Sequence, residues 1–187
     1  SETMPTFYES GARGPNWRVV PSSDEVIWFS QRDNWGHLYL YDLNTGQLKN
    51  RITQGDWNVV QILDVDARRR TITFVGNERE PGDPYFTYLY RIDFDGSDLK
   101  LLTPDSANHT VSLSPDGRFI IDSYSTPTIP PVTVLRDAEG RQLMELERAD
   151  IERLRAAGWQ APIPFTVKAR AGVTGLYGLK YRPGGLD

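Results

Sequence analysis

The sequence predicts an all-β fold: a partial β-propeller of about three four-stranded antiparallel blades, with one short connector helix and a C-terminal β-hairpin. Short runs rich in β-branched and aromatic residues occur along most of the chain and are typical of strands. One strand–turn–strand pattern recurs three times, with turn glycines at Gly46, Gly96 and Gly140. The spacing of these glycines matches the ~40–50 residues of a propeller blade.

The first copy of the pattern begins with an apolar run at 26–30 and a polar turn at 31–36. Residues 37–42 then alternate between apolar and polar with the period of a strand. Asn44-Thr45-Gly46 has the composition of a hairpin turn, and residues 47–53 form the return strand.

The other two copies repeat these parts in the same order. In the second copy, the apolar run, the alternating strand, the turn and the return strand fall at 71–75, 88–93, 95–96 and 99–103. In the third copy, the same four parts fall at 119–121, 132–137, 139–140 and 142–146. Inner strands are expected before the three apolar runs, at 17–20, 57–63 and 110–113. A single twisted sheet cannot bury both of its faces, so each copy is expected to stack on the next.

The pattern changes after Leu146. Residues 147–157 are rich in helix formers, Gly158 can end a helix, and two prolines prevent its continuation. Strands resume at 165–169 and 176–181. The predicted segments are a lead-in (1–15), three blades within 16–146 (about 16–53, 57–103 and 110–146), a connector helix (147–160) and a strand pair (161–187). A surface helix that caps the last blade explains the spacing equally well.

Composition excludes several classes of site. The net charge of −4 argues against a nucleic-acid partner, and the absence of cysteine excludes disulfides, thiolate nucleophiles and Cys-ligated zinc. No apolar run has the length of a membrane span, and the first residues lack the features of a signal peptide.

Several sequence segments, in their order along the chain, resemble segments of the bacterial dipeptidyl peptidase IV-like enzymes of the prolyl oligopeptidase family (S9). They are Trp-Gly-His-Leu-Tyr-Leu-Tyr-Asp at 35–42, and residues 52–59, 76–78, 89–92 and 112–117, followed by the helix and 165–183. The last two look like the passage from the propeller into the α/β-hydrolase domain. The resemblance implies a fragment of a larger, periplasmic or secreted serine peptidase, whose eight-bladed propeller leads substrate to the active site.

The family removes N-terminal dipeptides, often after proline, with a serine in a Gly-x-Ser-x-Gly elbow that this chain lacks. The triad acid and histidine follow that serine, the oxyanion-hole tyrosine is not Tyr181, and the paired glutamates that bind the substrate's amino group belong to an earlier blade. We therefore assign no catalytic, cofactor-binding or metal-binding residue here. A family loop near residues 7–13 can line the substrate pocket, but no substrate-binding residue is assigned. The alternative is a stand-alone WD-like interaction scaffold.

Structural roles are favoured over catalytic or ligand-binding roles for the residues that suggest chemistry. His37 is expected to hydrogen-bond within its blade, and His109 to join a structural network. The tryptophans at 28, 35 and 57 are expected to pack in the core or between blades. Asp93, Asp95 and Asp98 suggest a calcium loop, but Pro104 stands where its bidentate glutamate is required. The arginines at 68–70 are expected to be solvated, and residues 78–84 to form an exposed loop.

An incomplete propeller has two blade faces that no neighbour covers. The expected partners in the parent are the rest of the propeller and, as the family resemblance implies, the hydrolase domain and a peptide substrate. Alone, the fragment is expected to form a homodimer or a higher oligomer through exposed faces or edge strands.

Overall fold

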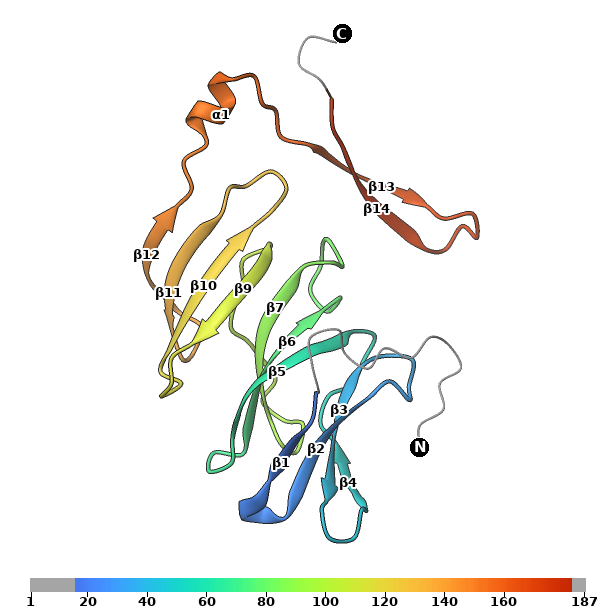
Figure 1. Cartoon of the computed structure of the whole chain (residues 1–187). Coiled ribbons are helices and arrows are strands. Elements are labelled where there is room, and N and C mark those ends of the chain that lie inside the picture. The colour runs from blue at the N-terminus through green and yellow to red at the C-terminus, as the bar shows by residue number, and fades with distance from the viewer. Residues whose placement is uncertain (1–15, 183–187) are drawn as a thin grey trace. The chain divides into compact units, whose positions relative to one another are not determined.

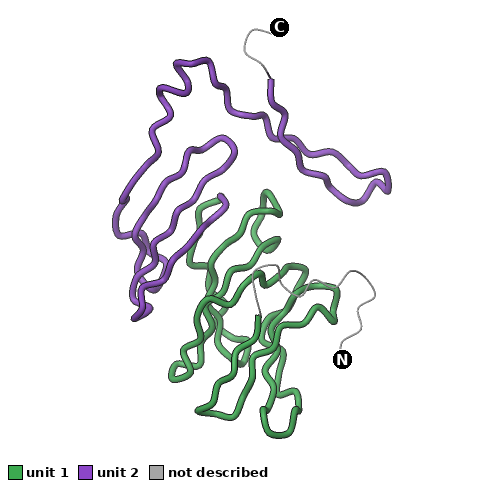
Figure 2. Tube along the Cα trace, in the orientation of Figure 1, with its two compact units in different colours: residues 1–106 green, residues 107–187 purple. Residues whose placement is uncertain are grey.

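The computed structural model describes residues 16–182, which form three four-stranded antiparallel sheets, a two-stranded hairpin and one short helix (Figure 1). This confirms the predicted all-β fold class. The chain divides into two compact units, residues 1–106 and 107–187 (Figure 2).

Two sheets form the first unit, each with its strands in sequence order. The first sheet contains β1 (Arg18–Val20), β2 (Glu25–Ser30), β3 (His37–Asp42) and β4 (Leu48–Arg51), with a 3-10 turn at Pro21–Ser23. The second contains β5 (Asn58–Asp66), β6 (Thr71–Asn77), β7 (Thr87–Asp93) and β8 (Lys100–Leu101). Gly46 and Gly96 have φ of 70° and 89° in the turns before β4 and β8, as expected for hairpin glycines.

The second unit contains one sheet, the helix and the hairpin. The sheet has the order β12-β11-β10-β9, formed by β9 (Asn108–Leu113), β10 (Phe119–Ser125), β11 (Val132–Asp137) and β12 (Gln142–Arg148). Helix α1 (Glu152–Ala156) precedes the hairpin of β13 (Ile163–Lys168) and β14 (Gly175–Lys180).

The helix is shorter than the sequence predicts, and the strand before it is longer. Glu147 and Arg148 were expected to be helical, but they pair with Thr133 and Val132 of β11. Cross-strand pairing therefore overrides their helix propensity. The Asp150 carboxylate accepts a hydrogen bond from the amide of Glu152 at 2.8 Å, at the start of the five-residue helix that remains.

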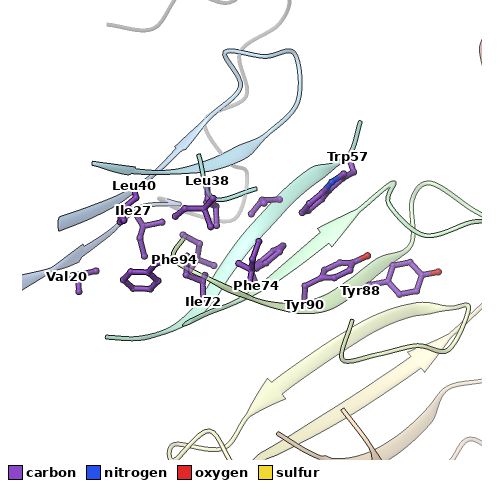
Figure 3. Packing of buried hydrophobic residues seen from close by; sticks show 14 residues of the cluster. Val20, Ile27, Leu38, Leu40, Trp57, Ile72, Phe74, Tyr88, Tyr90 and Phe94 are labelled. Carbon is purple, nitrogen blue, oxygen red and sulfur yellow. The ribbon is translucent and has the colours of Figure 1, made fainter. Parts of the chain in front are cut away.

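The first two sheets share one hydrophobic core (Figure 3). The first sheet contributes aliphatic side chains, including Ile27 and Leu38, while the second contributes a group of aromatic rings. The ring centroids of Trp57 and Phe74 are 6.0 Å apart, and those of Phe74 and Tyr90 are 5.5 Å apart. Trp57 packs between sheets as predicted, whereas Trp28 is 40% exposed.

A threonine fastens the segment that follows each of these sheets. In the first sheet the amide of Leu38 donates to Thr53 Oγ1 at 3.0 Å, and in the second the amide of Leu89 donates to Thr103 Oγ1 at 2.8 Å. Both hydroxyls are buried. We call these contacts the first and second threonine links.

We expect Gly96→Ala to destabilise the chain more than Gly46→Ala, although both glycines occupy left-handed turn positions. A Cβ on Gly96 would lie 2.8 Å from the carbonyl oxygen of Ile52, whereas one on Gly46 would meet nothing within 4 Å. Backbone strain alone costs about 1–2 kcal/mol, so the collision should raise the cost at Gly96 to about 3 kcal/mol. Urea unfolding of both variants measures this, and equal losses would contradict it.

Candidate functional site

Three connecting segments lie at one end of the first unit, which we call the rim end. They are the β2–β3 loop (31–36), the linker between the sheets (52–57) and the β6–β7 loop (78–86). The register brings them together, because Asn58 at the start of β5 pairs with Asn77 at the end of β6. The side chain of Asn58 also accepts a hydrogen bond from the Gly36 amide at 2.8 Å. Function in β-folds is concentrated on such loops.

Tyr39 is the centre of a polar cluster at the rim end. Its hydroxyl donates to Asp33 at 2.6 Å, and Asp33 also pairs with Arg51 at 3.1 Å. The guanidinium of Arg32 lies 4.3 Å from the centroid of the tyrosine ring, a cation–π contact. Burial and then the hydrogen bond to Asp33 raise the pKa of Tyr39 to about 12. This phenol therefore stays protonated at neutral pH and acts as a hydrogen-bond donor.

Tyr90 makes a similar cluster with the β6–β7 loop. Its hydroxyl donates to Glu80 at 3.1 Å, and Arg79 pairs with the same carboxylate at 2.7 Å. Burial is the main cause that raises the pKa of Tyr90, followed by the negative charge of Glu80. Part of this loop is thus attached to the core, whereas the sequence predicted only an exposed loop.

His37, the first residue of β3, has no contact with solvent. Its Nδ1 is 3.0 Å from Thr53 Oγ1, and its Nε2 is 2.9 Å from the carbonyl oxygen of Gly55. Burial lowers the pKa of this imidazole, which favours its neutral form. With both nitrogens engaged, His37 is positioned to hold the linker and has no ring nitrogen available as a general base.

His109 of the second unit forms a buried charged network. Its Nδ1 lies 2.8 Å from Asp122, whose other carboxylate oxygen accepts a hydrogen bond from Arg136 Nε at 2.9 Å. Arg136 also donates to the carbonyl oxygen of Gly140 at 3.2 Å. A catalytic His–Asp pair positions its imidazole for a nucleophile, but here the carboxylate also neutralises a buried arginine. The geometry is that of a structural network within the sheet.

Glu25 joins the first two sheets away from the rim end. Its carboxylate accepts hydrogen bonds from Arg70 Nη1 at 2.8 Å and Nη2 at 3.2 Å, from Ser23 at 2.7 Å, and from Lys49. The hydrogen bonds from Arg70 contribute most to lowering the pKa of Glu25 to about 2. The sequence prediction missed this role of Arg70. Nothing in the run of three arginines distinguishes it from its neighbour Arg69, whose side chain is 80% exposed.

The aspartates that suggested a calcium loop lie at the end of β7 and in the turn before β8. Asp95 Oδ1 accepts hydrogen bonds from the amide and hydroxyl of Ser97, so it stabilises a turn. Between residues 16 and 182, no three His, Asp or Glu side chains gather in a way that could hold a metal ion. Tyr181 is 69% exposed. Residues 7–13, the loop that the family resemblance placed near a substrate pocket, lie outside the described residues.

No helix in the described part of the chain is long and apolar enough to cross a membrane. The single helix there, α1, has five residues.

Comparison with solved structures supports the propeller architecture. The crystal structure of Porphyromonas gingivalis dipeptidyl peptidase 4 matches 91% of this chain with a TM-score of 0.73 and 24% sequence identity. The match covers 24% of that protein's chain. This confirms the predicted partial propeller.

Sequence comparison gives the family. The chain is 31% identical over 116 residues to dipeptidyl peptidase 4 of Trichophyton rubrum, and 31% identical over 113 residues to that of Trichophyton equinum. Both matches cover 59% of this chain and 14% of the relative, so the chain matches about a seventh of their length. The family model of the dipeptidyl peptidase IV (DPP IV) N-terminal region matches residues 1–131. The chain therefore belongs to the family defined by that N-terminal region.

Proposed function

We propose that this chain is the non-catalytic propeller segment of a dipeptidyl peptidase IV-like serine exopeptidase that removes N-terminal dipeptides, often after proline. The match of residues 1–131 to the N-terminal region of that family carries the proposal. The buried histidines add support, since His37 holds a linker and His109 shares its carboxylate with Arg136. In the parent protein the segment walls the tunnel to the active site and admits small peptides.

The rim end is the part of the segment that performs this gating. It carries a buried tyrosine in each of its two sheets, Tyr39 and Tyr90, and each is paired with a loop carboxylate. Arginines cover both rings, with Arg32 over Tyr39 and Arg79 over Tyr90. A rim whose loops are held in place by these contacts can restrict the size of a peptide that passes.

Activity with a Gly-Pro chromogenic dipeptide tests the function. The 187-residue chain should give no turnover, whereas the protein encoded by the complete reading frame, with the earlier blades and the sequence after Asp187, should be active. Its matched control replaces the serine of the expected Gly-x-Ser-x-Gly elbow with alanine and should be inactive. A reading frame that stops without such an elbow, or turnover by this chain alone, would overturn the proposal and favour the WD-like scaffold.

The C-terminal hairpin is the proposed junction with the hydrolase domain. One of its faces carries Ile163, Phe165 and Val167 from β13 and Leu176 from β14, each 46–50% exposed. A two-stranded hairpin with such a face is marginally stable in water on its own. In the parent, this face packs against the rest of the hydrolase domain. Phe165→Asp should leave unfolding of this chain unchanged and should lower the stability of the longer protein.

The isolated chain self-associates through the third sheet. Ile121, Leu135 and Met144 form a cross-strand row on β10, β11 and β12, and Ile121 and Met144 are 47% and 53% exposed. The row is the uncovered apolar face of an incomplete propeller. Light scattering at micromolar concentration should report a dimer or a higher oligomer, and Ile121→Glu should shift it to monomer. Leu43→Glu, in an exposed turn of the first unit, is the control and should leave the oligomeric state unchanged. A monomeric 187-residue chain without substitutions would refute this model of association.

A further inference from the structure

The first threonine link contains a histidine whose protonation state the contacts specify. The carbonyl of Gly55 can only accept a hydrogen bond, so Nε2 of His37 must carry the proton. Thr53 Oγ1 already accepts from the amide of Leu38, which leaves its hydroxyl proton to donate to Nδ1. The link is therefore satisfied in full by a neutral imidazole with its proton on Nε2.

A second proton would disrupt this arrangement. Protonated Nδ1 would point a donor at the Thr53 hydroxyl, which would have to turn its own proton away from its acceptor. It would also place a positive charge on a ring that is 0% exposed. The charged groups that act on this ring are Asp33 and Asp56, which favour the cation, and Arg51, which opposes it. Neither hydrogen-bond partner of the ring nitrogens is a carboxylate, so no direct ion pair offsets the loss of hydration.

The imidazole also contacts the aromatic group of the core. The ring of Trp57 meets it edge-on with centroids 5.5 Å apart, and the indole donates to the carbonyl of Gln54 in the same linker at 2.7 Å. Trp57 lies 5.9 Å from Tyr90, whose hydroxyl bonds Glu80 of the β6–β7 loop. Continuous contact therefore connects His37 to that loop.

The second threonine link serves as an internal comparison. Leu89 and Thr103 repeat the hydrogen bond of Leu38 and Thr53, but the residue before Leu89 is Tyr88. Tyrosine has an ordinary pKa near 10, far above mild acid, and burial raises the pKa of Tyr88 further. Only the first link contains a group that can gain a proton between pH 7 and 5.

We propose that His37 is an acid-sensitive latch: its protonation releases the linker at 53–57 and loosens the β6–β7 loop, while the second threonine link stays closed. The expected direction follows from linkage. A buried imidazole with a pKa below 6.5 binds protons less well in the folded chain than in the unfolded chain. Its contribution is therefore complete above about pH 6.5 and is lost as the pH falls toward the folded-state value. The proposal does not depend on the peptidase function.

Hydrogen exchange of the 187-residue chain at pH 7.5 and 5.0 tests the latch, after correction for the intrinsic pH dependence of exchange. Amides of residues 53–59 should lose protection on the order of tenfold at pH 5.0, because each pH unit below the unfolded-state value is worth up to tenfold. Amides of residues 101–106 other than Pro104, at the second link, should keep theirs. Equal responses at the two links would overturn the proposal.

His37→Gln is the matched variant, because the amide of glutamine can still donate to Gly55 but cannot titrate. It should abolish the difference between pH 7.5 and 5.0 at residues 53–59, and acid loosening that persists in it would refute the latch. If this variant does not fold, an NMR titration of the native chain decides. The imidazole of His37 and the indole of Trp57 should then shift with one midpoint below pH 6.5, and independent midpoints would count against the coupling.

Discussion

Asp122→Asn is expected to destabilise the second unit by about 3–5 kcal/mol, as removal of one partner from a buried ion pair does. The carboxylate of Asp122 is fully buried between two donors, and the side chain of Arg136 is 3% exposed. Asparagine would lose the negative charge and turn an amide N–H toward either Arg136 or His109. A buried guanidinium would then remain without its counter-charge. Chemical denaturation, followed by a probe in the second unit, measures the loss.

Asp116→Asn provides the control for this prediction. Asp116 also pairs with an arginine and lies in the same sheet unit, but its contact with Arg118 is exposed to solvent. Exposed ion pairs contribute little to stability, so Asp116→Asn should unfold at the same denaturant concentration as the unsubstituted 187-residue chain. If the two asparagine variants were equally stable, the network of Asp122 would not be holding the sheet.

Sequence periodicity predicted the strands well because each strand obeys a local rule. The glycines at 46, 96 and 140 occupy left-handed turns, which depend on near neighbours. The strand at 37–42 forms as predicted, although its first four residues are all buried. The end of the third sheet was less predictable. Glu147 and Arg148 are strand residues only because β11 lies beside them, and no local pattern contains that information.

The contacts between sheets could not be predicted from sequence for the same reason. Glu25 and Arg70 are far apart in sequence, and their pairing depends on how the first sheet meets the second. His37 and Thr53 likewise lie in different parts of one blade. The sequence could predict that His37 is more plausible as a hydrogen-bonded residue than as a base, but its partners required the fold.

Glu25→Gln is the other substitution with a large expected effect, about 2–3 kcal/mol. The side chain of Glu25 is 1% exposed, while those of Arg70 and Lys49 are 45% and 43% exposed. The two cations can therefore reach water when their partner is neutralised, which places the loss at or below the lower end of the range for a buried pair. Arg70→Gln should reproduce most of this loss in urea unfolding. Arg69→Gln, in the same turn, should have no measurable effect.

The pH dependence of stability identifies the charge as the cause. Because the pKa of Glu25 falls from 4.5 to about 2 on folding, the unfolded chain binds the proton more readily. The ionised carboxylate therefore stabilises the fold fully above about pH 4.5, and this contribution disappears as the pH approaches 2. Glu25→Gln should thus be less stable than the unsubstituted 187-residue chain at pH 7. The difference in their free energies of unfolding should shrink steadily below pH 4.5. A constant difference across that range would mean that the shape of the side chain, rather than its charge, joins the two sheets.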